Sequence, residues 1–170
     1  MDMIIKAVDL CGFFGPPILF FSSLYFLYKK TSLLYIYLLG FTINMLINFV
    51  VKGFLKYPRP YEDIHIFNAL VNSGKRIGFD RYGMPSGHAQ NVIYSTIYVY
   101  FALKDVKITI FYAIISLLTM YQRIKYKNHS VIQVIVGAIM GALIGYSFYI
   151  YARKTMAGKL KGRDDDNAPI

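Results

Sequence analysis

The sequence is poor in cysteine, tryptophan and acidic residues. Cys11 is the single cysteine among its 170 residues, which excludes an intrachain disulfide and a cysteine metal cluster. We expect Cys11 to pack as a small apolar side chain. Nine Asp and Glu stand against 19 Lys and Arg, so the formal net charge is +10. Charged residues amount to only 16%, compared with roughly a quarter in soluble domains, which disfavours an ordinary soluble protein.

Hydrophobic residues, at 56%, are abundant and fall into long runs. Such runs are typical of membrane-spanning helices, each of which needs about 20 apolar residues. The excess of Lys and Arg fits this interpretation, because basic residues flank spans and contact anionic headgroups. A nucleic-acid partner is not expected, since few basic residues fall on a surface that a soluble protein would present. The sequence therefore predicts an integral, multi-pass membrane protein.

Five apolar runs predict spanning helices, and a polar connection separates the second from the third. The runs cover about residues 10–28, 33–55, 88–103, 107–121 and 129–151. Gly15-Pro16-Pro17 interrupts the first run, which predicts a kink or a short preceding helix. The predicted fold class is all-α, a multi-pass transmembrane helical bundle of about five to six spans. Residues 1–152 form the predicted membrane domain, and residues 153–170 a basic and acidic, disordered tail.

Five spans would place alternate connections on opposite faces of the membrane. One face holds residues 29–32, residues 104–107 and the tail; the other holds the N-terminus, the 56–86 connection and the 122–129 turn. The positive-inside rule puts the first face in the cytoplasm once the basic residues of the motifs below are set aside. The N-terminus lacks the basic start and cleavage site of a signal peptide, so we expect it to stay attached. Asn44 and Asn48, one turn apart within a span, are expected to link helices.

Three short segments on the non-cytoplasmic face carry nearly all the reactive side chains. In the first, Lys52 ends the second run, and six residues separate it from Arg59. Two cations so close favour a shared anion. Pro58 and Pro60 restrain the backbone of Arg59 between them. The guanidinium held there is suited to bidentate binding of phosphate.

The second segment is Pro85-Ser86-Gly87-His88, at the start of the third run. A helix N-terminus attracts anions, because its free N–H groups point outward with a positive dipole. Ser86 adds a hydroxyl donor, and Gly87 lets a ligand approach the backbone. His88 can give or take a proton, so this segment predicts phosphate binding together with acid–base chemistry.

The third segment contains Arg123 and, after five further residues, His129. Gln133 follows at the spacing of one helical turn. Glycines continue the same spacing at Gly137, Gly141 and Gly145. They predict close helix packing along this face. We expect Gln133 to accept a hydrogen bond from Nδ1–H of His129, which would leave Nε2 unprotonated.

Together the three segments resemble the type 2 phosphatidic acid phosphatase superfamily. Its signature is Lys, six residues, Arg-Pro; then Pro-Ser-Gly-His; then Ser-Arg, five residues, His, three residues, Asp. The first two parts occur unchanged in this sequence, and the third keeps its Arg and His. Gln122 replaces the Ser and Gln133 replaces the Asp. The resemblance covers about residues 33–150.

The resemblance implies a helical bundle and a cofactor-free, metal-free reaction through a phosphohistidine. By that analogy His129 attacks phosphorus, His88 protonates the leaving oxygen, and Gln133 supports His129. The phosphoryl oxygens would be held by Lys52, Arg59, Ser86, Gly87 and Arg123. Phosphoryl transfer depends chiefly on positioning and charge neutralisation, which these residue types provide. No metal site is expected, since no other His, Asp and Glu set has ligand spacing.

The function expected from this resemblance is hydrolysis of a phosphoric monoester or diphosphate of a lipid on the non-cytoplasmic face. Residues 82–88 are also similar to dolichyl diphosphatases, so a polyprenyl diphosphate is the first substrate expected. Phosphatidic acid and phosphatidylglycerophosphate are the next. Two alternatives are a phosphotransferase to an alcohol and a catalytically weak relative that binds lipid phosphate. Glu62, Asp63 and Asp80 are interpreted as solvated loop charges, and His65 as a loop residue.

Overall fold

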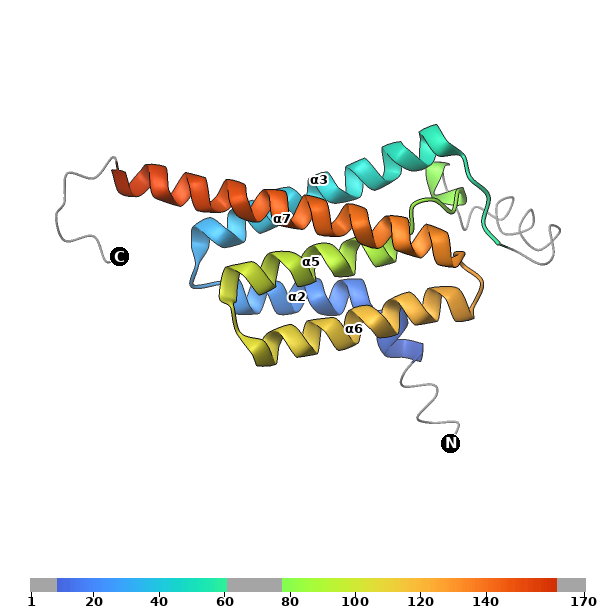
Figure 1. Ribbon diagram of the computed structural model, residues 1–170, viewed down its shortest axis with the longest axis horizontal. Coiled ribbons are helices and arrows are strands. Elements are labelled where there is room, and N and C mark those ends of the chain that lie inside the picture. The colour runs from blue at the N-terminus through green and yellow to red at the C-terminus, as the bar shows by residue number, and fades with distance from the viewer. Residues whose placement is uncertain (1–8, 61–77, 162–170) are drawn as a thin grey trace.

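Helices make up the regular structure of the computed structural model, which describes residues 9–60 and 78–161 (Figure 1). In chain order the elements are α2 (Gly15–Leu27), α3 (Thr31–Leu55), the 3-10 helix η1 (Gly78–Arg81), α5 (Gly87–Leu103), α6 (Val106–Lys125) and α7 (Val131–Lys161). The described residues contain no strand, so the predicted all-α class is confirmed for this part of the chain.

The helices follow the predicted apolar runs, with one difference at the C-terminal end. As predicted, a short helical segment precedes α2 and ends near Phe14, with Pro16 in the first turn of α2, where a missing N–H is tolerated. α7, however, continues to Lys161. The prediction of a disordered tail from Arg153 is therefore wrong for residues 153–161, because the helix runs on beyond its apolar part. The rest of that tail lies outside the described residues.

α5 occupies the centre of the bundle, between α7 on one side and α2 and α6 on the other (Figure 1). Two buried tyrosines of α5 form hydrogen bonds to the backbone of α3. The hydroxyl of Tyr94 donates to the carbonyl of Tyr37 at 2.8 Å, and the hydroxyl of Tyr98 donates to the carbonyl of Leu33 at 2.7 Å. Each buried hydroxyl thereby has a partner, so large aromatic rings can fill the core without an unsatisfied polar atom.

The most extensive helix contact joins α5 to α7, and glycines on α7 permit it. A Cβ on Gly137 would lie 2.5 Å from the carbonyl oxygen of Ser86, and one on Gly141 would lie 2.2 Å from that of Gln90. A Cβ on Gly145 would lie 2.8 Å from the carbonyl oxygen of Tyr94. The predicted close packing along this glycine face is confirmed. It brings the start of α7 next to the start of α5.

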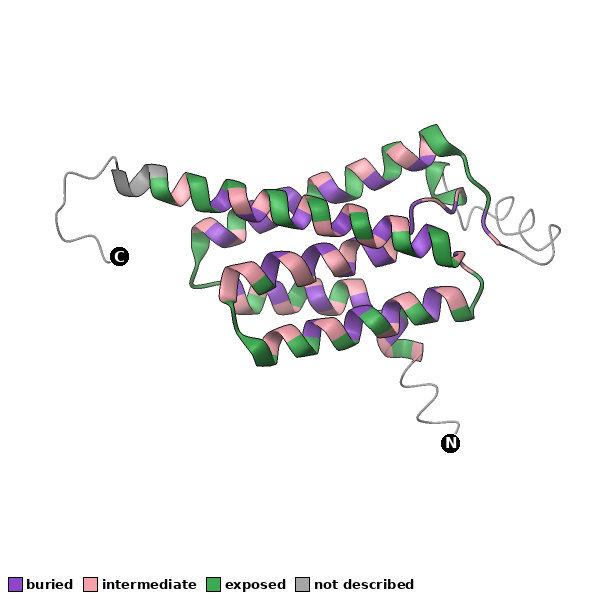
Figure 2. Ribbon diagram, in the orientation of Figure 1, coloured by how far each residue is buried: buried purple, intermediate pink, exposed green. Residues whose placement is uncertain are grey.

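Two of the described helices are long and apolar enough to cross a membrane, α3 and the stretch Val131–Ala157 of α7. α2 is apolar but short. The predicted number of about five to six spans is therefore not confirmed. Exposed positions recur along the helices (Figure 2). Many of them carry large apolar side chains, among them Phe21, Tyr35, Phe54 and Leu143. An exterior of this kind suits contact with lipid better than contact with water.

We predict that Gly141→Ala destabilises the protein by about 1–3 kcal/mol, because the added methyl group overpacks the contact with the α5 backbone. The measurement is the thermal unfolding midpoint in detergent. Ser147→Ala, at an exposed position of the same helix, is the matched control and should leave the midpoint unchanged. Equal midpoints for the Gly141→Ala variant and the parent would show that α5 and α7 are less closely packed.

Candidate active site

A cavity of about 510 Å³ lies at the end of the bundle where α3 and α6 end and α5 and α7 begin. All three sequence motifs contribute to its wall. The motif residues that line it are Lys52, Arg59, Gly87, His88, Arg123 and His129. Ser86 and Gln133 are buried but are not part of the lining. The fold thus gathers six of the eight predicted site residues around one space.

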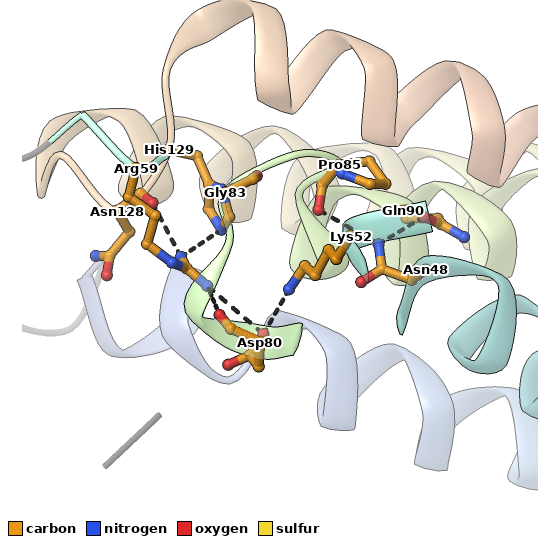
Figure 3. A network of polar contacts seen from close by, with 9 residues as sticks. All are labelled: Asn48, Lys52, Arg59, Asp80, Gly83, Pro85, Gln90, Asn128 and His129. Carbon is orange, nitrogen blue, oxygen red and sulfur yellow. Dashed lines mark hydrogen bonds and ion pairs between the residues drawn. The ribbon is translucent and has the colours of Figure 1, made fainter. Parts of the chain in front are cut away.

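His129 lies in the turn before α7, with its imidazole fixed at both nitrogens (Figure 3). Nδ1 is 2.8 Å from the carbonyl oxygen of Gly83. A carbonyl only accepts hydrogen bonds, so Nδ1 carries the proton and Nε2 keeps a lone pair. Nε2 in turn lies 3.0 Å from Nη1 of Arg59. Burial, followed by the charges of Arg59 and Lys52, lowers the pKa of His129 to about 2, so the ring is neutral near pH 7.

Arg59 and Lys52 share one carboxylate within the cavity wall (Figure 3). Lys52 forms an ion pair with Asp80, and Nη2 of Arg59 lies 3.5 Å from the same carboxylate oxygen. Arg59 also donates to the backbone carbonyls of Asp80 at 2.8 Å and Asn128 at 3.0 Å. Both cations are buried, whereas the side chain of Asp80 is 54% exposed. Asp80 therefore places an anion between the two cations that the sequence assigns to phosphate.

Arg123 reaches the cavity from the last turn of α6. Its Nε donates to Oε1 of Gln122 at 2.7 Å, and its guanidinium carbon lies 5.3 Å from the ring centre of Phe13. The ring of Phe13 is also 6.1 Å from that of His88. Gln122, where the family signature has Ser, thus orients the guanidinium, and Phe13 in the segment preceding α2 packs against two residues of the site.

The predicted hydrogen bond from Nδ1 of His129 to Gln133 is wrong, because the acceptor is the carbonyl oxygen of Gly83. The Nε2 group of Gln133 donates to the carbonyl of Pro58 at 2.7 Å, and its Oε1 accepts from the N–H of Ser130 at 3.1 Å. A Cβ on Gly83 would lie 2.6 Å from the Gln133 amide, so the two residues are packed closely. Gln133 is therefore a positioning residue, which holds the backbone of Pro58 next to Arg59 and that of Ser130 next to His129.

The start of α5 is also tied to Gln133. The N–H of Ser86 donates to the backbone carbonyl of Gln133 at 3.0 Å. The Oγ atom of Ser86 is buried and makes no hydrogen bond within the described residues. Its hydroxyl can therefore still donate to a ligand, beside Gly87 and His88 in the first turn of α5.

Sequence reasoning missed several residues of the site. Asp80 was interpreted as a solvated charge, and the roles of Gly83 and Asn128 rest on backbone carbonyls that any residue type would supply. Asn91, one turn along α5 from His88, also lines the cavity. The expected link between helices through Asn44 is confirmed, since its Nδ2 donates to Oδ1 of Asn91 at 2.8 Å. Glu62, Asp63 and His65 lie outside the described residues.

The fold and the site define an all-helical protein with a cationic, histidine-containing pocket suited to a phosphoryl group. A model of the PAP2 superfamily matches residues 33–157. The chain belongs to the PAP2 superfamily, and the predicted resemblance to type 2 phosphatidic acid phosphatases is confirmed.

One curated relative supports the same family at the level of sequence. The chain is similar to a dolichyldiphosphatase of Saccharomyces cerevisiae, with 31% identity over 121 residues, which cover 65% of this chain and 48% of that protein. The chain thus spans about half of the length of this relative. No solved structure matches the chain.

We predict that Asp80→Asn makes the site bind inorganic phosphate about fivefold more tightly. The substitution removes an anion that competes for Lys52 and Arg59, and a partly exposed ion pair contributes about 1 kcal/mol. The backbone carbonyl that accepts from Arg59 is retained. Titration calorimetry of the detergent-purified protein measures the effect.

The matched control is Asp105→Asn, which makes the same charge change at the N-cap of α6, at the other end of this helix from Arg123. Its phosphate affinity should equal that of the parent. Unchanged or weaker phosphate binding in Asp80→Asn would mean that the carboxylate does not compete with the anion.

We predict that Gln133→Glu weakens phosphate binding about tenfold. The new carboxylate can still accept from Ser130 N–H, but it repels the carbonyl of Pro58 and so displaces Arg59. Calorimetric titration with inorganic phosphate measures the loss, and a thermal unfolding scan checks that the variant is folded. If a folded Gln133→Glu variant binds phosphate as the parent does, Gln133 does not position Arg59.

Proposed function

We propose that this protein is a membrane lipid phosphatase that hydrolyses a lipid phosphate or a polyprenyl diphosphate through a phosphohistidine intermediate. The observation that carries the proposal is the fixed state of His129. Its Nδ1 donates to Gly83, and its unprotonated Nε2 accepts from Arg59 at the wall of a cavity that Lys52 and Arg123 also line. An unprotonated nitrogen beside buried cations suits attack on a phosphoryl group.

The reaction would proceed in two displacements at phosphorus. Nε2 of His129 attacks the terminal phosphorus, an N–P bond forms, and the P–O bond to the leaving group breaks; the leaving group is the lipid alcohol for a monophosphate and the lipid monophosphate for a diphosphate. His88 gives a proton to the departing oxygen of that group. Water, deprotonated by His88, then attacks the phosphohistidine, which releases inorganic phosphate and restores His129. The cations and the free N–H groups at the start of α5 balance the charge on the phosphoryl oxygens in both steps.

The substrate's tail would lie along α3. From Lys52 toward the middle of α3, the cavity wall changes to the apolar side chains of Phe49, Leu46 and Met45. These residues are also exposed on the outer face of the helix, so the cavity is continuous with a surface suited to lipid. The similarity to a dolichyldiphosphatase supports a polyprenyl diphosphate as the first substrate to assay. We place the site on the non-cytoplasmic face of the membrane, on the charge distribution of the connections.

We predict that replacing His129 and replacing His88 cause different defects in catalysis. His129→Ala should abolish phosphate release and the covalent phosphoenzyme with every substrate. His88→Ala should slow hydrolysis of a lipid phosphate by about 10²-fold or more, because the leaving alkoxide needs a proton. With an activated aryl phosphate, whose leaving group needs no proton, the His88→Ala defect should shrink markedly.

Phosphate release by the purified protein in detergent, with rapid quench to trap the phosphoenzyme, measures these effects. Parental phosphoenzyme levels in folded His129→Ala would refute the assignment of the nucleophile. Equal defects of His88→Ala on both classes of substrate would refute its role as the acid. An excess of phosphorylated alcohol over free phosphate when glycerol is added would favour a phosphotransferase instead.

A further inference from the structure

A chain of amide side chains runs from the loop before α5 into the cavity. Nδ2 of Asn48 donates to Oε1 of Gln90 at 2.7 Å and lies 3.4 Å from the carbonyl oxygen of Pro85 (Figure 3). Nε2 of Gln90 donates to the backbone carbonyl of Asn44 at 2.9 Å and to its Oδ1 at 2.8 Å. Nδ2 of Asn44 then donates to Oδ1 of Asn91 at 2.8 Å.

The direction of these hydrogen bonds is fixed by the backbone. The carbonyls of Pro85 and Asn44 can only accept, so the amides of Asn48 and Gln90 must point their nitrogens toward them. Asn44 consequently accepts from Gln90 and donates to Asn91. The oxygen of Asn91 thereby accepts from Asn44. Its NH₂ group can then donate to a ligand in the cavity that Asn91 lines.

Asn91 lies on the leaving-group side of the site. It follows His88 by three residues on α5, a rise of about 4.5 Å along the helix. Across the cavity, the apolar residues Met45, Leu46 and Phe49 of α3 line the part expected to hold the lipid tail. The cavity therefore presents, in order, cations, the acid His88, a neutral hydrogen-bond donor, and apolar side chains.

We propose that Asn91 is the specificity-determining residue of a subsite for the second phosphoryl group of a lipid diphosphate. This inference rests on the proposed phosphatase function and names its substrate class. In a diphosphate, the leaving oxygen that His88 protonates is bonded directly to a phosphorus with further acceptor oxygens. In a glycerophospholipid the same oxygen is bonded to a CH₂ group, and the ester oxygens lie several bonds away. A donor one helical turn from His88 matches the first arrangement.

The neutrality of the donor is also informative. Transfer of the terminal phosphoryl group leaves a lipid monophosphate, whose charge grows as the P–O bond breaks. An amide N–H stabilises this charge by a hydrogen bond, yet it holds the product less tightly than a further Lys or Arg would. The subsite can therefore assist departure without retaining the lipid product.

The test is Asn91→Asp, which keeps an oxygen for Asn44 and replaces the NH₂ donor by an acceptor. Hydrolysis of a polyprenyl diphosphate and of the polyprenyl monophosphate with the same chain is compared in detergent. We expect the ratio of kcat/KM for diphosphate over monophosphate to fall about tenfold or more, with Asn91→Ala giving a smaller fall in the same direction. The monophosphate is the internal control, because it lacks the group that Asn91 would bind.

An unchanged ratio in both folded variants would overturn the inference, as would a parent protein that hydrolyses the monophosphate but not the diphosphate. A selective loss toward phosphatidic acid would also overturn it, in favour of a glycerol ester as the bound group. In each of these cases phosphate is still released from a lipid, so the proposed function survives. Failure of the parent on every lipid phosphate would instead refute the proposed function.

Discussion

Burial of positive charge around one cavity is the constraint on which the rest of the site depends. Lys52, Arg59 and Arg123 are 3%, 8% and 6% exposed. Removing a cation from water costs several kcal/mol unless oxygen atoms replace its hydration shell. The carboxylate of Asp80 and the carbonyls of Asp80 and Asn128 supply such oxygens, and they come from two connections far apart in the sequence. Both connections lie at the same end of the bundle, where each supplies a carbonyl that accepts from the guanidinium of Arg59.

Neutral amides hold this charged site in place. Gln133 joins the turn before α7 to Pro58, and its backbone joins the start of α5. Gln122 orients Arg123, and Gln90 links α5 to α3. An amide satisfies buried backbone groups without adding a charge that would compete with a phosphoryl group for the cations. The close contact at Gly137 brings α7 near enough to the start of α5 for the backbone carbonyl of Gln133 to accept from the N–H of Ser86.

Much of this could be predicted from the sequence, because apolar runs and short motifs encode it locally. The helices follow the runs, and Lys52, His88 and His129 meet because the ends of successive helices alternate between two faces. The role of Asp80 was not predictable, since it depends on how η1 folds back over α3. The error at Gln133 has a specific cause. The four-residue spacing places two side chains on one face only within a helix, but α7 begins at Val131, so His129 lies outside the helical register.

The substitution of Gln133 for the signature Asp changes where negative charge lies in the site. The carboxylate among the cavity-lining residues is Asp80, which pairs with Lys52 and Arg59, and the partner of Nδ1 is the neutral carbonyl of Gly83. Before substrate binds, burial and then the charges of Arg59 and Lys52 lower the pKa of His129, so its ring is neutral. In the proposed reaction the ring gains positive charge when Nε2 bonds to phosphorus, and the group that Nδ1 contacts is a neutral carbonyl, which offsets that charge less than a carboxylate would. The phosphoryl oxygens must offset the rest. A terminal phosphoryl group brings two negative charges and a phosphodiester only one, so in the proposed reaction a terminal phosphate would offset the charge on the ring better.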